Sequence, residues 1–318
     1  MKTKILITGS AGFIGSSLAE RLLATSKSLV IGVDIFTDFY NPLYKKANID
    51  RLKKYANFRF FETDIGDEKA METIFSGFSP QIVVHLAALT GVRTSFKFPD
   101  RYEKINILGT QTLARIASRH RIHAFIFSSS SSVYGTTHQI PFQEIQILKP
   151  ASPYAKTKLE GEKILMQFAQ KINLPVTILR LFSVYGPNGR PDMAPYLFTE
   201  AAFSGRKISQ FGDGTSARDY TFIDDVIHAF ENAIKFKYSG EIVNVGNSSP
   251  TSLTKLMQLI EQKTNHKINA VIKPVNPGES MVTFANIDKA RKMLQWEPHV
   301  SFERGMQKFI SWYKLHRL

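Results

Sequence analysis

Residues 4–15 read Lys-Ile-Leu-Ile-Thr-Gly-Ser-Ala-Gly-Phe-Ile-Gly, and this stretch decides the fold. A short aliphatic run enters a glycine-rich turn, and a segment with Leu18, Leu22 and Leu23 on one helical face follows. Strand, glycine turn and helix in this order open a βαβ unit. The stretch therefore predicts a parallel sheet with helices packed on its faces.

The three glycines of the turn have separate roles in binding a dinucleotide. Gly9 permits the tight turn, Gly12 lets a pyrophosphate approach the backbone, and Gly15 lets the helix pack closely on the strand. The helix N-terminus faces the phosphate charge. Asp34 ends the next apolar run, about twenty residues on, where its carboxylate can accept both ribose hydroxyls. Because an anion there repels a 2′-phosphate, the sequence predicts NAD rather than NADP as cofactor.

Further apolar runs recur along the chain with helical stretches between them. Each run is continuous rather than alternating in polarity, which indicates burial on both faces. With the first run included, strands are expected at residues 5–8, 29–34, 58–61, 82–86, 125–127, 176–179 and 242–245. This repetition predicts a Rossmann-like, doubly wound α/β fold.

Apolar positions at helical spacing predict the connecting helices. One lies between the second and third strands, and the others at residues 67–75, 99–120, 153–172 and 224–236. Between residues 186 and 219 we expect Pro/Gly-rich loop with one helix at 194–204. After Gly246 we expect helix, strand and helix. We therefore expect an NAD-binding domain of residues 1–182 and 219–246, and a smaller mixed α/β C-terminal substrate domain of residues 183–218 and 247–318.

Composition restricts the class of protein. The 318 residues suffice for two domains, and 43% hydrophobic with 21% charged residues is typical of a globular protein. The chain has no cysteine, which excludes disulfides, thiolate nucleophiles, Fe–S clusters and sulfur-ligated zinc. A reducing compartment, the cytoplasm, is the expected location. The first apolar run ends at Gly9, far short of a signal peptide or a bilayer span.

The charge balance allows anionic ligands. There are 41 Lys and Arg residues against 27 Asp and Glu residues, so the net charge is +14. The basic residues are dispersed, and clusters such as 115–121 are interleaved with apolar residues at helical spacing, which favours solvated helix faces over a surface for a nucleic acid or membrane. The eight histidines have no metal-binding spacing, so no metal is predicted, and His85 is interpreted as structural.

A tyrosine and a lysine form the candidate acid–base pair. Residues 152–158 read Ser-Pro-Tyr-Ala-Lys-Thr-Lys, with Ser152 as expected N-cap and Pro153 in the first turn of a helix. Tyr154 and Lys158 are four residues apart and share a helical face. A free tyrosine has a pKa of about 10, and a nearby ammonium favours its phenolate.

Five serines, Ser128 to Ser132, follow the fifth expected strand. They therefore lie at the carboxyl edge of the sheet, where ligands of doubly wound folds bind. One of these hydroxyls can bond the reacting oxygen.

The chain resembles the extended short-chain dehydrogenase/reductases over nearly its whole length. The resemblance rests on the order of the glycine turn, Asp34, Asp64, His85-Leu86-Ala87-Ala88, the serines with Val133-Tyr134-Gly135, and Tyr154 with Lys158. Within this family it is similar to the NAD-dependent nucleotide-sugar 4-epimerases, and specifically to the UDP-glucuronate 4-epimerases. That similarity lies in residues 88–95, Ala-Leu-Thr-Gly-Val-Arg-Thr-Ser, and 185–194, Tyr-Gly-Pro-Asn-Gly-Arg-Pro-Asp-Met-Ala.

The resemblance implies roles for individual residues. Tyr154, Lys158 and Ser130 would be catalytic, since Ser130 occupies the family's Ser/Thr position before Val133-Tyr134-Gly135. The implied cofactor contacts are Gly9, Gly12, Phe13, Ile14, Gly15, Asp34, Asp64, Ile65, Ala87, Ala88, Tyr154 and Lys158. Of these, Asp64 and Ile65 would meet the adenine, and Ala87 and Ala88 would line the cofactor. The helices at 99–120 and 153–172 resemble the pair through which the family forms a four-helix homodimer interface.

The serine run also separates the chain from relatives with other reactions. Sugar-nucleotide dehydratases resemble Ser-Thr-Asp-Glu-Val-Tyr-Gly, and decarboxylases likewise carry Glu before Val-Tyr-Gly, because their chemistry needs an extra acid or base. Here Ser131 and Ser132 stand at those places. The change favours plain oxidation and re-reduction at C4 of the sugar.

Several residues are candidates for binding the substrate. Arg218 matches a basic position that the family uses for the nucleotide diphosphate, and a guanidinium offers it paired donors. Galactose epimerases usually carry Arg just before a later Pro-Gly-Asp, but here Asn276 precedes Pro-Gly and Glu279 replaces Asp, where the family contacts the uridine ribose. The amide resembles that of uronate epimerases.

A UDP-uronate adds a carboxylate at C5. Candidate partners for it are Arg93, Arg190, Ser131, Ser132 and Ser183, with solvated surface side chains as the alternative interpretation. The predicted reaction is the reversible C4 epimerisation of UDP-glucuronate to UDP-galacturonate through a 4-keto intermediate. The alternatives are a 4-epimerase of neutral UDP-hexoses, UDP-glucose or UDP-GlcNAc, and, more distantly, a non-enzymatic NAD-sensing regulator that binds nucleic acid.

Overall fold

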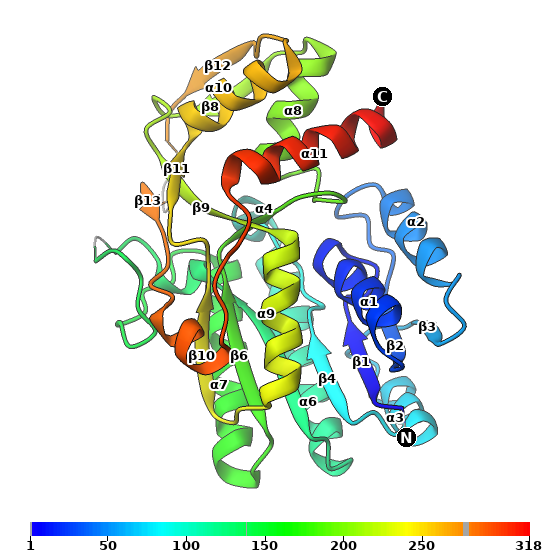
Figure 1. The fold of residues 1–318 in the computed structure, drawn as a ribbon. Coiled ribbons are helices and arrows are strands. Elements are labelled where there is room, and N and C mark those ends of the chain that lie inside the picture. The colour runs from blue at the N-terminus through cyan, green and yellow to red at the C-terminus, as the bar shows by residue number, and fades with distance from the viewer. Residues whose placement is uncertain (1, 138, 276–279) are drawn as a thin grey trace. The chain divides into compact units, whose positions relative to one another are not determined.

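A seven-stranded sheet forms the centre of the Rossmann-like part of the computed structural model, which describes residues 2–137, 139–275 and 280–318 (Figure 1). The strand order is β10-β6-β5-β4-β1-β2-β3. The strands are β1 (Lys4–Thr8), β2 (Leu29–Asp34), β3 (Phe58–Glu62), β4 (Ile82–His85), β5 (Ala124–Ser130), β6 (Val176–Leu181) and β10 (Glu241–Val245). Parallel registers join β1 to β2 and β4, β2 to β3, and β4 to β5. The chain winds outward from β1 in both directions, which confirms the predicted doubly wound fold and its seven strands.

Close contacts divide the chain into two units, and each is described by itself. The first unit comprises residues 1–133, 150–180 and 229–243, and the second comprises 134–149, 181–228 and 244–318. The contacts thus group residues 134–149 and 219–228 with the second unit. The predicted domain boundaries at 182, 219 and 246 stay a prediction.

The helices between the strands cover the sheet. They are α1 (Phe13–Thr25), α2 (Pro42–Leu52), α3 (Glu68–Phe78), α4 (Val92–Lys97), α5 (Pro99–Tyr102), the π-helical η1 (Glu103–Leu108), α6 (Gly109–Arg119), the 3₁₀ turn η2 (Ser131–Tyr134), α7 (Pro153–Ile172) and α9 (Ile223–Phe236). The helix predicted at 99–120 is therefore three consecutive pieces. Its π-helical turn carries Asn106, whose side chain bonds both backbone groups of Leu89 and the Thr157 hydroxyl. Such turns occur frequently at functional sites.

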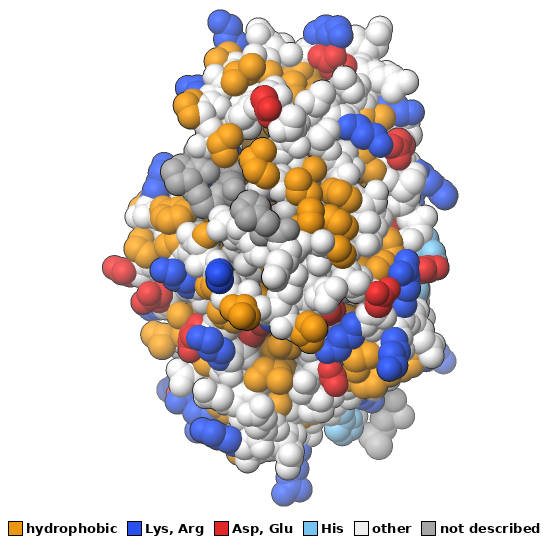
Figure 2. All heavy atoms as spheres, turned by 90° about the vertical axis from the view of Figure 1, so that its left-hand side faces the viewer, with side chains coloured by type: hydrophobic (Ala, Val, Ile, Leu, Met, Phe, Trp, Pro, Cys, Tyr) orange, Lys and Arg blue, Asp and Glu red, His pale blue; other side chains and the backbone are white. Residues whose placement is uncertain are grey.

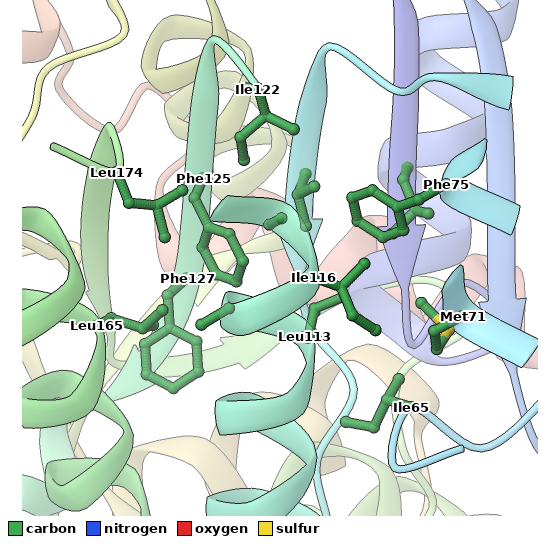
Figure 3. Close-up of a cluster of buried hydrophobic side chains, with 14 of the residues drawn as sticks. Ile65, Met71, Phe75, Leu113, Ile116, Ile122, Phe125, Phe127, Leu165 and Leu174 are labelled. Carbon is green, nitrogen blue, oxygen red and sulfur yellow. The ribbon is translucent and has the colours of Figure 1, made fainter. Parts of the chain in front are cut away.

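The core of the first unit lies between the sheet and the helices α3, α6 and α7 (Figure 3). Phe125 and Phe127 project from one face of β5, because alternate residues of a strand share a face. They meet Leu113 of α6 and Leu165 of α7. This packing fixes α7 against the strand that carries the serines.

The second unit is built on β9 (Ala217–Phe222). This strand pairs with β11 (Pro250–Ser252) antiparallel and with β7 (Ser183–Tyr185) and β13 (Val282–Thr283) parallel, while β8 (Ile208–Phe211) pairs with β12 (Ala270–Lys273). Its further helical segments are α8 (Ala194–Ser204), α10 (Leu253–Thr264), the π-helical turn η3 (Ala290–Leu294) and α11 (Phe302–Arg317). The helix predicted at 194–204 is α8, but the loop predicted for the rest of residues 186–219 was wrong in part, because β8 and the start of β9 also lie there. Both strands obtain their partners from segments distant in sequence, so local periodicity does not mark them.

The buried carboxylate of Asp219 joins three segments of the second unit. It accepts hydrogen bonds from the backbone N–H groups of Asn247, Ser248 and Ala285, at 2.7, 3.0 and 2.9 Å. Burial raises the pKa of Asp219 to about 6, against the lowering effect of these donors. These bonds hold the β9 backbone in place, and with it the neighbouring Arg218. Within the described part of the chain, no helix is both long and apolar enough to cross a membrane.

Candidate active site

The glycine turn brings β1, the end of β4 and α1 into close contact. Gly9 has φ +74°, and a Cβ on it would lie 2.7 Å from the Ala87 nitrogen. A Cβ on Gly15 would lie 2.1 Å from the Gly9 carbonyl oxygen. Side chains at either position would therefore push the turn apart.

The N-terminus of α1 suits a diphosphate. Its N-cap is Gly12, so no side chain accepts a hydrogen bond from the first turn, which begins at Phe13 and Ile14. Uncapped N–H groups together with the helix dipole form an anion site. A Cβ on Gly12 would lie 3.2 Å from the Gly9 oxygen and would narrow this approach.

Asp34 at the end of β2 has a fixed carboxylate. One oxygen accepts the Ala11 N–H at 2.9 Å, and the other accepts the Ile35 N–H at 2.7 Å and the Lys45 ammonium at 2.9 Å. Both side chains of the ion pair are largely buried. Lys45, which sequence reasoning missed, offsets part of the negative charge on which the preference for NAD rests.

The other expected cofactor contacts differ in burial and in their hydrogen bonds. The Ile65 side chain is buried in the core (Figure 3), so it is not available to a ligand. Asp64 accepts the Gly66 N–H at 2.8 Å, and Ala87 donates its N–H to the Thr8 hydroxyl at 3.3 Å. Ala88 is half-buried. With the uncapped helix and Asp34, these residues fit a dinucleotide.

His85 is a buried, neutral link between β1, β4 and α6. Thr110 donates to the Asn106 carbonyl at 2.6 Å, so it accepts from Nε2–H of His85 at 2.9 Å, while Nδ1 accepts from Thr8 at 2.7 Å. Burial, with a contribution from the Lys158 charge, lowers the pKa of His85 to about 3. The ring therefore carries no charge near neutral pH.

Tyr154 and Lys158 lie on α7 as the sequence predicts. Ser152 caps this helix by accepting the Ala155 N–H at 3.1 Å, and proline occupies the first turn, which confirms the predicted helix start. The Tyr154 ring meets the Tyr102 ring edge-on, with centroids 6.3 Å apart. The Lys158 Nζ lies 4.2 Å from the centroid of the Phe127 ring, and burial lowers the pKa of Lys158 to about 7.

The five serines have different surroundings. Ser129 is buried and donates to the Glu162 carboxylate. Ser130, half-buried at the end of β5, donates to the Ser132 hydroxyl at 3.1 Å and accepts the Ser132 N–H at 3.2 Å. Ser131 and Ser132 begin the turn η2. The hydroxyl of Ser129 is thus bound within the core, while Ser130 lies at the carboxyl edge; the catalytic role of Ser130 stays a prediction.

Glu162 and Arg180 are a buried pair that sequence reasoning missed. Arg180 on β6 grips the carboxylate with two hydrogen bonds, of 2.9 and 2.7 Å. Glu162 lies one helical turn beyond Lys158, which was a signal in the sequence. Arg180 lies on a different element, β6, so the sequence contained no signal that it pairs with Glu162.

The remaining substrate candidates lie on separate elements of the two units. In the first unit, Arg93 is exposed on α4. In the second unit, Arg190 forms two hydrogen bonds with Asp192, of 3.0 and 2.5 Å, and Ser183 is half-buried on β7. Arg218 donates to the carbonyl oxygens of Ala217 and Met281, at 3.0 and 3.3 Å.

Arg218 also borders a small hollow in the second unit. The hollow is lined by Phe211, Gly212, Asp213, Ser216, Arg218, Val275, Ser280 and Met281. Asn276 and Glu279 lie outside the described residues. In the parts of the chain that the structure describes, no group of three acidic or histidine side chains could hold a metal ion.

Comparisons with known proteins place this chain in a family. The family model for GDP-mannose 4,6-dehydratase matches residues 6–309. The UDP-glucuronate 4-epimerase of Thermodesulfobacterium geofontis is 36% identical, over 97% of this chain and 95% of its own.

Two solved structures are also similar over nearly the whole chain. A UDP-glucuronic acid 4-epimerase from Bacillus cereus, in complex with UDP-glucuronic acid and NAD, has a TM-score of 0.94 at 35% identity, covering 98% of this chain and 99% of that one. The UDP-glucose 4-epimerase of Thermotoga maritima, with UDP-glucose, has a TM-score of 0.91 at 34% identity, with the same coverage. The chain therefore belongs to the extended short-chain dehydrogenase/reductases, in the family that the GDP-mannose 4,6-dehydratase model describes.

Proposed function

We propose that this protein is an NAD-dependent 4-epimerase that interconverts UDP-glucuronate and UDP-galacturonate. The observation that carries the proposal is that only serines, Ser130 to Ser132, lie at the carboxyl edge of β5. Tyr154 and Lys158 on α7 are therefore the candidate acid–base pair. Without a carboxylic acid in the serine run, elimination and decarboxylation lack the extra acid or base that they need. Oxidation and re-reduction at C4 need one group that accepts and returns one proton.

The residues of the first unit divide this reaction between them. The Tyr154 phenolate, stabilised by the charge of Lys158, accepts the proton of the 4-hydroxyl, and Ser130 donates a hydrogen bond to the same oxygen. NAD, held by the glycine turn, the N-terminus of α1 and Asp34, would supply a reversible hydride acceptor for C4, and the sugar would turn about its diphosphate between oxidation and re-reduction. Tyr154 then gives the proton back, so no oxidant is consumed.

A uronate makes one further demand on the site. Its 4-keto form is a β-keto acid, which loses CO₂ when the carboxylate bond stands perpendicular to the carbonyl plane. The candidate donors for that carboxylate are Arg93, Ser131 and Ser132 in the first unit. In the second unit they are Ser183 and Arg190. The two hydrogen bonds between Arg190 and Asp192 support this role for Arg190, because they have the bidentate geometry in which a guanidinium binds a carboxylate. The sugar carboxylate would take the place of Asp192.

The second unit is proposed to bind the nucleotide. Arg218 and the hollow beside it offer a cation for the diphosphate next to apolar atoms of Phe211 and Val275. The division into a cofactor domain, 1–182 with 219–246, and a substrate domain, 183–218 with 247–318, belongs to this proposal. So does Glu279 as a contact of the uridine ribose.

One observation favours a neutral sugar as the second candidate substrate. While Arg190 is paired with Asp192, its charge is already balanced, which suits UDP-glucose or UDP-GlcNAc better than a uronate. The two similar epimerase structures are nearly equal in identity to this chain, at 35% and 34%, so identity does not separate the substrates.

A homodimer in the cytoplasm completes the proposal. Phe96, Phe98 and Leu108 are 54%, 49% and 56% exposed along the segment that leads from α4 into α6, and a second copy would cover them. The face in Figure 2 shows Lys and Arg side chains spread among acidic and apolar ones rather than gathered in one patch, so we propose no nucleic-acid partner. Light scattering at micromolar concentration should give twice the mass of the chain, and a monomer would contradict the dimer.

Product analysis tests the activity directly. The purified protein is incubated with UDP-glucuronate, UDP-glucose and UDP-GlcNAc separately, and NAD is measured after denaturation. We expect UDP-galacturonate as the main product and NAD released from the protein. Faster turnover of a neutral sugar would favour the second candidate, and bound NADP without NAD would contradict the cofactor.

A further inference from the structure

Three charged side chains are buried together below the carboxyl edge of β5. Lys158 is 4% exposed, and Glu162 and Arg180 are each 2% exposed. Removing a charge from water is costly unless it is paired and hydrogen-bonded. Glu162 is ion-paired with Arg180, and its charge also opposes the lowering of the Lys158 pKa by burial, so the position of that carboxylate affects both cations.

The Glu162 carboxylate is held from two neighbouring strands. Arg180 on β6 donates Nε–H to Oε1 at 2.9 Å and an Nη2–H to Oε2 at 2.7 Å, and Ser129 on β5 donates its hydroxyl to Oε1. A bidentate guanidinium fixes both the position and the plane of a carboxylate. Glu162 therefore cannot turn away from α7 without losing all three bonds.

Lys158 lies one helical turn before Glu162, in a nearly dry environment. The Phe127 ring is 4.2 Å from its Nζ, and the same β5 face carries Ser129. The titratable and charged groups around it are Tyr154 and Glu162 on its own helix, His85 on β4, Tyr102 on α5, which meets Tyr154, and Arg180 on β6, which acts through Glu162. His85 is neutral across the neutral and alkaline range, so Glu162 supplies the balancing charge.

We propose that Glu162 is a positioning residue of the epimerase, whose carboxylate, oriented by Arg180 and Ser129, keeps Lys158 charged on the face of α7 that carries Tyr154. The inference rests on the proposed function, because the charge of Lys158 affects the reaction by stabilising the Tyr154 phenolate. Burial lowers the pKa of Lys158 and Glu162 opposes that effect. Loss of the Lys158 proton therefore sets the alkaline limit of the reaction, and Glu162 determines where that limit falls.

Two substitutions break the same ion pair but change the charge near Lys158 in opposite directions. Glu162→Gln removes the anion, so Lys158 should lose its proton at a pH lower by on the order of one unit. Arg180→Met removes the competing cation, so Glu162 should act more fully on Lys158, and the proton should be lost at higher pH. A pair that served only to hold β6 and α7 together would shift the titration in one direction or not at all.

Each single variant leaves an unbalanced buried charge, so the double variant Glu162→Gln/Arg180→Met is the control for folding. It replaces both charges with neutral side chains of similar size. Its Lys158 titration should fall between those of Glu162→Gln and the wild type. If neither single variant folds, a double variant with the wild-type titration would overturn the proposal.

The primary readout is the Lys158 side chain itself. In protein labelled with ¹³C-lysine and carrying its bound cofactor, the Cε resonance is followed against pH and assigned by its loss in Lys158→Met. The alkaline limb of kcat with UDP-glucuronate is measured on the same variants. Opposite shifts of resonance and limb support the proposal, whereas folded single variants with unchanged or parallel shifts overturn it.

The two readouts also separate this inference from the proposed function. A wild-type protein without activity on any UDP-sugar would overturn the epimerase assignment. Opposite shifts of the Lys158 resonance would still establish that Glu162 controls the charge of this lysine. Normal epimerase activity with parallel shifts would overturn only the role of Glu162.

Discussion

The two units hold their charged site residues in different ways. In the first unit, Lys158, Glu162 and Arg180 are buried, and their partners come from the fold itself. In the second unit, Arg190 and Arg218 are only partly buried, and each bonds a group that a ligand can replace, the Asp192 carboxylate or backbone carbonyl oxygens. Under the proposed function, proton transfer would use charges that are fixed on folding, while substrate selection would use cations that exchange partners.

The largest expected effect comes from removing the proton acceptor of the first unit. Tyr154→Phe should lower kcat by at least about 10³-fold, because a positioned acid–base group contributes on this scale and the ring volume is kept. NAD content and UDP-sugar affinity should stay near the wild-type values, as measured by release on denaturation and by calorimetry. Tyr55→Phe, outside the site, is the matched control. An active Tyr154→Phe variant would show that another group accepts the proton of the 4-hydroxyl.

Substitutions of two neighbouring serines test whether the end of β5 contributes to catalysis through Ser130 and to stability through Ser129. Ser130→Ala should slow epimerisation by on the order of 10²-fold, since it removes a donor to the reacting oxygen, with Ser132 close enough to compensate in part. Ser129→Ala removes a bond to buried Glu162, so it should lower the melting temperature with a smaller effect on kcat. Thermal unfolding and initial rates are measured on both. The reverse pattern would move the catalytic serine to Ser129.

The proposed role of Arg190 in the second unit is tested by two variants with opposite expected effects on UDP-glucuronate. Arg190→Ala should slow UDP-glucuronate turnover by about 10- to 100-fold, the value of a charged hydrogen bond, and release CO₂ and a UDP-pentose. Asp192→Asn should strengthen UDP-glucuronate binding, because it removes the competing carboxylate. UDP-glucose kinetics, which involve no C5 carboxylate, serve as the reference for both. Wild-type rates without pentose in Arg190→Ala would exclude this arginine and favour the neutral sugar.

The sequence predicts those parts of the molecule that depend on continuous local signals. The inner strands of the large sheet are mostly apolar and buried, and the edge strands β3 and β10 still contain enough apolar residues to be predicted, although β3 is only partly buried. The start of α7 at Ser152 was also predictable. The short strands β8 and β9 depend on distant partners and were not. The Glu162–Arg180 and Asp34–Lys45 pairs join residues on different elements, which a single sequence does not connect. In contrast, Asp192 lies two residues after Arg190, so this pair was readable from the sequence.

The smallest expected effect concerns the Asp34–Lys45 ion pair, which shares one property with the charged residues of each unit. It is largely buried like the Lys158 cluster, yet it lies at the proposed cofactor site, as Arg190 lies at the proposed substrate site. Lys45 balances the carboxylate that disfavours a 2′-phosphate, so Lys45→Ala should lower the affinity for NADP relative to NAD by roughly 3- to 10-fold, a fraction of the value of a charged pair. Competitive displacement of NAD measures this ratio. Lys46→Ala, which alters the next, exposed residue, is the matched control and should leave the ratio unchanged. If Lys45→Ala raises the relative affinity for NADP, Lys45 orients Asp34 rather than offsetting its charge.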